Sequence, residues 1–286
     1  MLNLVLGIFF SSVLYIVFKL YSKYNVNTFQ AIVFNYIVAF LVGIYLNNEN
    51  LEITILLNKP WLVGSIILGA LFIVVFNILA KTSQENGVSV ASVSSKMSMI
   101  IPILFGIFFF KETLSYGKII GIIIALIAVY FTSKKESGKI NISNFTYPIL
   151  VFFGAGIVDT TMNYLQHEYV SQNEIALFSA TTFIFAFCFG VLIILFKVLK
   201  ENYKLDSKSL IGGIALGIPN YFSMYYLIKA LQNKNIESAS VFTLINIGVI
   251  LLSSLFGILF FKEKINKQNF IGILLAITAV ILVTNL

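Results

Sequence analysis

A duplicated stretch constrains this chain more than any other feature of its sequence. Phe105–Val129 reads FGIFFFKETLSYGKIIGIIIALIAV, and Phe256–Val280 reads FGILFFKEKINKQNFIGILLAITAV. Aligned without gaps, the two copies are identical at about half of their positions. Each copy joins two apolar runs through a short charged break at Lys-Glu, which predicts a tight hairpin of two membrane-spanning helices. An internal repeat of this kind indicates a chain built from two related halves.

The composition predicts a membrane protein with many spans. Hydrophobic residues make up 59% of the chain and charged residues 11%, whereas soluble domains carry about 25% charged residues. A membrane-spanning helix needs about 20 mostly apolar residues. The segments that meet this requirement are Leu2–Leu20, Thr28–Leu46, Trp61–Lys81, Val88–Phe110, Tyr116–Thr132, Tyr147–His167, Glu174–Val198, Lys208–Ala230, Ile236–Phe261 and Lys267–Leu286.

The repeat extends beyond the hairpin and divides the chain into residues 1–135 and 145–286, with five helices in each half. Gly69 and Ser92, for example, recur as Gly217 and Ser240. The second copy is three residues longer between these positions and the hairpin. Because five is an odd number, the second half must insert upside down relative to the first. Inverted repeats place a substrate path near the middle of the bilayer, between the halves.

The repeated hairpin and the five-plus-five organisation resemble the EamA branch of the drug/metabolite transporter superfamily, over essentially the full length of the chain. The resemblance implies an all-α membrane protein with ten helices in two inverted repeats. It also implies a secondary transporter with a central cavity, lined mainly by the first, third, fourth, sixth, eighth and ninth helices. Members of the family move amino acids, other metabolites, nucleotide-linked sugars or drugs, so the motif does not define the substrate.

Two charged residues lie deep inside predicted spans, Lys96 in the fourth helix and Asp159 in the sixth. A charge at this depth costs about 2.5–3.5 kcal/mol on insertion scales and indicates a functional site. Helical spacing places Ser92 on the face of Lys96 and Asn163 on the face of Asp159. We expect these faces to share an aqueous cavity and bind substrate or a proton. The alternatives are a buried pair that only fixes helix packing, or a Lys96 side chain that extends to the headgroups.

Uncharged polar residues on the other helices complete the predicted substrate site. Each of them more often makes a hydrogen bond between helices than a ligand contact, but together they mark the helices that line the cavity in the family. They are Ser11, Tyr15, Asn77, Asn220, Ser223, Thr243 and Asn246. Pro102 and Pro219 are expected to interrupt the fourth and eighth helices, as hinges or as static kinks. The repeated Glu112 and Glu263 are expected to be solvated helix-end residues with a structural role in the turns.

Other classes of function find less support in the sequence. One histidine, one cysteine and no clustered acidic pair argue against an enzyme, and we expect no catalytic residue, metal or cofactor. A lipid-linked flippase or a non-transporting scaffold would fit the same helices, but a scaffold has no need for Lys96 and Asp159. The chain has no P-loop, so we expect coupling to protons or to a counter-substrate. Expected partners are a small solute and the bilayer, not nucleic acid, for a monomer or homodimer in the inner membrane.

The orientation of the chain is open at this point. The 19 basic residues are all lysines, and most lie in loops on the side opposite to the termini. The positive-inside rule then places the termini outside the cytoplasm. The family resemblance implies the opposite, with both termini in the cytoplasm.

Overall fold

The computed structural model describes residues 2–46, 56–109, 115–134, 143–171, 174–201, 203–231 and 238–284, and within these ranges it contains helices and no strand. In chain order the helices are α1 (Leu2–Lys23), α2 (Thr28–Leu46), α4 (Leu62–Glu85), α5 (Val88–Met97), α6 (Ile100–Phe109), α7 (Tyr116–Ser133), α8 (Ser143–Glu168), α9 (Ile175–Glu201), α10 (Ser207–Leu231), α11 (Ser238–Phe261) and α12 (Lys267–Thr284).

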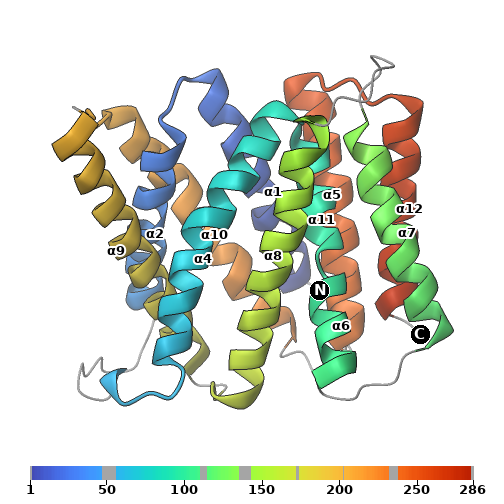
Figure 1. The fold of residues 1–286 in the computed structure, drawn as a ribbon, viewed down its shortest axis with the longest axis horizontal. Coiled ribbons are helices and arrows are strands. Elements are labelled where there is room, and N and C mark those ends of the chain that lie inside the picture. Colours follow the sequence, from blue (N-terminus) through green and yellow to red (C-terminus); the bar gives the residue numbers. More distant parts are fainter. Residues whose placement is uncertain are drawn as a thin grey trace.

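The helices run side by side in alternating directions (Figure 1), and the fold is the one that the sequence predicts. Over the described ranges, eight spans are long and apolar enough to cross a membrane, with α5 and α6 forming one of them. The α12 helix is apolar but shorter, and α10 carries more polar residues and packs against α1 and α2. We call the end where α1, α4, α7, α9 and α11 finish the lysine-rich end; it is the upper end in Figure 1.

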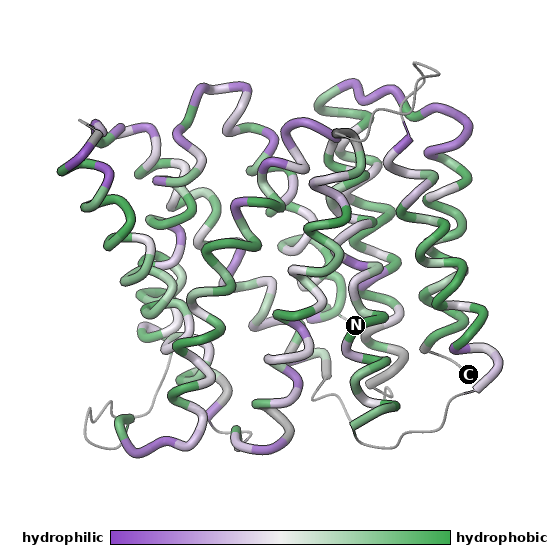
Figure 2. The backbone as a smooth tube through the Cα atoms, in the orientation of Figure 1, coloured by the Kyte–Doolittle hydropathy of each residue, from purple (hydrophilic) through white to green (hydrophobic). Residues whose placement is uncertain are grey.

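The outer surface of the bundle is apolar, as a lipid-facing surface must be. Large hydrophobic side chains such as Phe108, Leu192 and Ile211 are 81%, 61% and 70% exposed, and hydrophilic residues concentrate at the two ends of the bundle (Figure 2). Inside, Tyr36 and Phe72 stack 6.3 Å apart between α2 and α4. The chain is therefore packed for a hydrocarbon solvent and not for water.

The two halves of the chain interlock. From the first half, α2 packs on α10, and α1 packs on both α10 and α11. From the second half, α9 packs on α4, and α8 packs on both α4 and α5. Exchanging each helix for its counterpart reproduces these pairs, while α7 and α12 pack on each other. Glycine permits the closest approach: a Cβ at Gly217 would lie 2.7 Å from the Asn35 carbonyl. The two-repeat architecture is thus confirmed, and the contacts between the repeats dominate the bundle.

The fourth predicted span is broken into two helices. The α5 helix ends at Met97 and α6 begins at Ile100. Pro102 has no N–H to donate to the Ser98 carbonyl, which instead accepts from the Ile101 N–H at 2.9 Å. At Pro219, by contrast, α10 continues as one helix through the proline. A single missing hydrogen bond is tolerated where neighbouring helices hold the segment.

Candidate binding site at the broken helix

The break between α5 and α6 places polar groups at the depth where the sequence predicts a site. The Ser98 side chain is fully buried and its hydroxyl donates to the Ser95 carbonyl. The same hydroxyl lies 3.5 Å from Asp159 Oδ2 on α8. Asp159 therefore faces the break in the fourth span, and not only the lipid.

Lys96 and Tyr15 lie close to this carboxylate. Electrostatic interactions connect Asp159 with Lys96 and with Tyr15, and the Tyr15 side chain is within hydrogen-bonding reach of Ser95. The ion pairs recorded in the described part of the chain are Lys59–Glu174 and Lys81–Glu85. Lys96 and Asp159 are thus charged neighbours whose side chains do not form a direct salt bridge in this conformation.

The polar face of α8 is accessible. Asp159 and Asn163, one helical turn apart, are both exposed, and Lys96 is half-buried. The Asp159 carboxylate thus reaches from an exposed position on α8 to within 3.5 Å of a fully buried serine. A carboxylate in that position is available to a solute or a proton.

The second half of the chain contributes through α11 as well as α8. The Asn246 side-chain N–H donates to the Met99 sulfur at 3.3 Å, directly at the break. The cluster therefore joins α1, α5, α8 and α11, with two helices from each repeat. Tyr15, Lys96, Asp159 and Asn246 are the predicted site residues that the structure brings together.

The remaining predicted residues lie elsewhere or are engaged within their helices. Asn220 donates to Asn35 Oδ1 at 3.0 Å and so joins α10 to α2. Side-chain bonds to carbonyls of the same helix are made by Ser92, Asn77 and Ser223. Ser11 is half-buried and Thr243 is buried. These contacts favour the helix-joining interpretation for Asn220 in particular.

Sequence reasoning missed Ser95 and Ser98, which belong to the cluster. Both lie in the serine-rich run Ser89–Ser98 that precedes Pro102. A proline a few residues after a polar run in an apolar segment is the signal that points to a break lined by polar groups. Over the described ranges no group of His, Cys, Asp and Glu side chains is arranged to hold a metal ion.

A cavity of about 330 Å³ lies at the lysine-rich end, away from this cluster. Its walls include Lys19, Glu85, Glu263 and Asn269. Several of these groups are already engaged: Asn269 donates to the carbonyls of Phe131, Thr132 and Lys134. Glu263 accepts the Val88 N–H at 2.7 Å. The cavity is therefore bordered by contacts that hold helix ends together.

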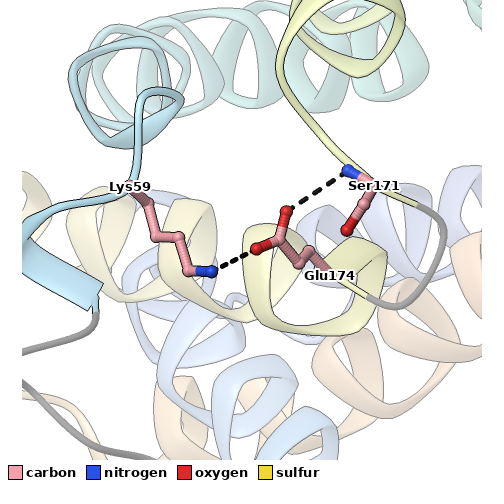
Figure 3. Close-up of polar contacts among 3 residues, drawn as sticks. All are labelled: Lys59, Ser171 and Glu174. Atoms are coloured by element: carbon pink, nitrogen blue, oxygen red, sulfur yellow. Dashed lines mark hydrogen bonds and ion pairs between the residues drawn. The ribbon is translucent and has the colours of Figure 1, made fainter.

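At the opposite end, Lys59 and Glu174 form an ion pair between the segment before α4 and the start of α9 (Figure 3). The second carboxylate oxygen of Glu174 accepts the Ser171 N–H at 3.3 Å. The hydrogen bond from Lys59 lowers the pKa of Glu174 to about 2. Because Lys59 belongs to the first half and Glu174 to the second, this pair also fixes the repeats to each other.

Comparisons with known proteins agree with this architecture. A family model described as the EamA-like transporter family matches residues 1–134 and 141–285. A protein of Haemophilus influenzae, described as uncharacterized, is 33% identical over 288 residues, covering 97% of this chain and 96% of the relative. A solved crystal structure has a TM-score of 0.63 and 17% identity, and covers 99% of this chain and 96% of its own. That similarity extends to the fold alone.

Proposed function

This chain belongs to the EamA-like transporter family, and we propose that it is a secondary transporter which carries a small polar solute through the cluster at the α5–α6 break. It is a multi-pass membrane protein, and we place it in the cell membrane. Alternating access between the two repeats would expose the cluster first to one side and then to the other. Both five-helix halves, 1–135 and 145–286, contribute residues to this cluster.

The observation that carries the proposal is the meeting of opposite charges from both repeats at one break. Lys96 comes from the first repeat and Asp159 from the second, and Asp159 Oδ2 lies 3.5 Å from the hydroxyl of Ser98, two residues after Lys96. Intramembrane charges are expensive and are retained where a pathway needs them. A broken helix beside such charges is an arrangement in which membrane carriers hold solutes and ions.

The chemistry of the cluster suits a solute with a charged group. A carboxylate on the solute would be attracted by Lys96, and an ammonium by Asp159, while Tyr15 and Asn246 offer hydrogen bonds. A solute that binds Lys96 weakens the attraction of that lysine for Asp159, so Asp159 takes up a proton more readily. Transport would then be coupled to a proton without ATP.

Transport into proteoliposomes, measured across a pH series with a panel of small metabolites, tests this function. We expect Asp159→Asn to leave the protein folded and inserted but to abolish the pH dependence of uptake. Thr161→Val is the matched control, because Thr161 lies on the same helix and its hydroxyl bonds to the Ile157 carbonyl. Uptake that keeps its pH dependence in Asp159→Asn would contradict proton coupling at this residue.

A further inference from the structure

The junction between α4 and α5 is tied to other helices by polar contacts at the lysine-rich end. Lys19 Nζ on α1 donates to the Gln84 carbonyl at 2.7 Å. The Gln84 side-chain N–H donates to the Phe18 carbonyl at 3.1 Å and to Thr28 Oγ1 at 2.9 Å. These bonds fix the end of α4 against α1 and α2, at one end of the bundle.

Glu263 makes the corresponding contact to α5 from the other repeat. It lies in the turn between α11 and α12, residues Lys262–Asn266. One carboxylate oxygen accepts the Val88 N–H at 2.7 Å, and the other lies 3.4 Å from Ser89 Oγ and 3.5 Å from its N–H. A carboxylate at the first N–H groups of a helix also interacts favourably with the helix dipole.

Two glycines lie close against the Glu263 carboxylate. Gly87 has a φ of +110°, and a Cβ there would lie 3.0 Å from Glu263 Oε1. A Cβ at Gly257 would lie 2.5 Å from Glu263 Oε2. Two glycines, one from each repeat, therefore make space for the side chain between them. The sequence predicted a solvated residue at a helix end for Glu263, but its carboxylate is instead held against the start of α5. Its counterpart Glu112 lies outside the described residues.

The turn that carries Glu263 is itself anchored. Asn269 donates to three carbonyls at the end of α7, and Asn266 donates to the Lys134 carbonyl at 3.2 Å. The pair α7 and α12 thus holds the turn in place, while Glu263 extends from it to α5. The α5 helix leads from this contact directly to Ser95 and Lys96 in the candidate site.

We propose that Glu263 is a clamp which keeps the lysine-rich end of the transport path closed in this conformation, an inference that rests on the proposed function. While its carboxylate holds the Val88 and Ser89 N–H groups, α5 cannot move away from the α11–α12 turn. Release of these bonds would free the start of α5 and open the path towards Lys96. Glu263 is a positioning residue, since it touches α5 and not the solute.

Thiol labelling without any solute tests the clamp. Ser92→Cys, in a Cys188→Ser background, places a reporter thiol one turn beyond Ser89, at a position that is fully buried. A membrane-impermeant maleimide is added to vesicles on the side of the lysine-rich end, and Tyr24→Cys in the exposed α1–α2 turn identifies that side. With Glu263→Gln we expect the reporter thiol to react at least about ten-fold faster, because a charged hydrogen bond is lost.

Two further variants make the result decisive. Gly257→Ala keeps the charge of Glu263 but pushes its carboxylate aside, and we expect the same acceleration. Glu85→Gln removes a carboxylate from the same cavity, near Lys81 and not at the start of α5, so it should leave the labelling rate unchanged. Folding of Glu263→Gln is checked by size-exclusion chromatography and thermal melting. If this variant fails to fold, the labelling rate of the reporter thiol in Gly257→Ala tests the clamp in its place.

The clamp and the proposed function fail in different ways. Unchanged labelling in folded Glu263→Gln and Gly257→Ala would overturn the clamp, whatever the protein transports. Equal acceleration in Glu85→Gln would also overturn it, because the effect would then come from lost charge at that end. Uptake that does not depend on pH in the wild-type protein would contradict proton coupling and leave the labelling result standing.

Discussion

At the scale of single residues, the deep charges decide where this chain can work. Asp159 and Lys96 lie in spans where an unpaired charge costs about 2.5–3.5 kcal/mol, and Asp159 contacts Ser98 at the break in the fourth span. Asp159 remains exposed in this arrangement. A purely structural pair would be expected to close into a salt bridge, so the open geometry favours a role in binding.

The Lys59–Glu174 pair gives a residue-scale prediction for pH. The pKa of Glu174, about 2 in the folded protein against an ordinary value of 4.5, means that Glu174 stabilises the fold above about pH 4.5 and loses this contribution as the pH falls towards 2. The side chains are 24% and 20% exposed, so solvent screening limits the contribution to about 1 kcal/mol or less. Glu174→Gln should lower the melting temperature at pH 7 slightly, and by less at pH 3.

The control for this prediction is Glu85→Gln. The charged atoms of Lys81 and Glu85 are 3.8 Å apart, and both side chains are about half exposed. We therefore expect Glu85→Gln to cause no measurable change in melting temperature. Thermal melting in detergent between pH 3 and pH 7 distinguishes the two variants. If the loss of melting temperature in Glu174→Gln is as large at pH 3 as at pH 7, the ion pair is not the source of that loss.

At the scale of elements, the break in the fourth span distinguishes the two repeats. Its counterpart α11 is continuous from Ser238 to Phe261, and the second copy is longer by three residues in this region. The first copy has Pro102 where a continuous helix would need an N–H for the Ser98 carbonyl. The repeats therefore differ at the element that carries the candidate site.

Replacing Pro102 tests the importance of the break. Pro102→Ala restores the missing N–H, and we expect α5 and α6 to become more nearly continuous, with thermal stability maintained or increased. Because Ser98 and Met99 would then move relative to Asp159 and Asn246, uptake should fall by about ten-fold or more. Pro219→Ala in the unbroken α10 is the control. Normal uptake in Pro102→Ala would show that the break is a static kink without a role in transport.

At the scale of the whole molecule, the ends of the bundle differ in charge. The exposed lysines of the α1–α2 turn, the α9–α10 segment and the α11–α12 turn all lie at one end, represented by Lys23, Lys204, Lys262 and Lys264. Short loops rich in lysine stay in the cytoplasm during insertion. The charge distribution thus predicts that the lysine-rich end, which Glu263 closes, faces the cytoplasm.

Cysteine labelling in intact cells tests this orientation. In a Cys188→Ser background, Leu57→Cys should react with an impermeant maleimide, and Tyr24→Cys should react only after the cells are opened. Both native residues are exposed, at 65% and 59%, so a missing reaction reports the side of the membrane and not burial. The reverse pattern would place the termini in the cytoplasm, as the family resemblance implies.

The sequence alone determined the class of the molecule and its plan. Long apolar runs fix helices in a bilayer because no other open structure satisfies the backbone there, and the repeated hairpin revealed the two halves. The same reasoning located Lys96 and Asp159, since a charge in an apolar run stands out locally. Tyr15 and Asn246 were found only as members of a larger polar set.

Only the tertiary structure decided which polar residues meet. Asn220 and Asn246 look alike in sequence, but Asn220 is bonded to Asn35 while Asn246 reaches Met99 at the break. Glu263 looked like a solvated residue in a turn, but it holds the start of α5 from the other repeat. The sequence could not show these outcomes because they depend on helix rotation and on contacts between residues that are far apart along the chain. Those contacts are set by how the ridges of neighbouring helices fit together, which is a property of the assembled bundle.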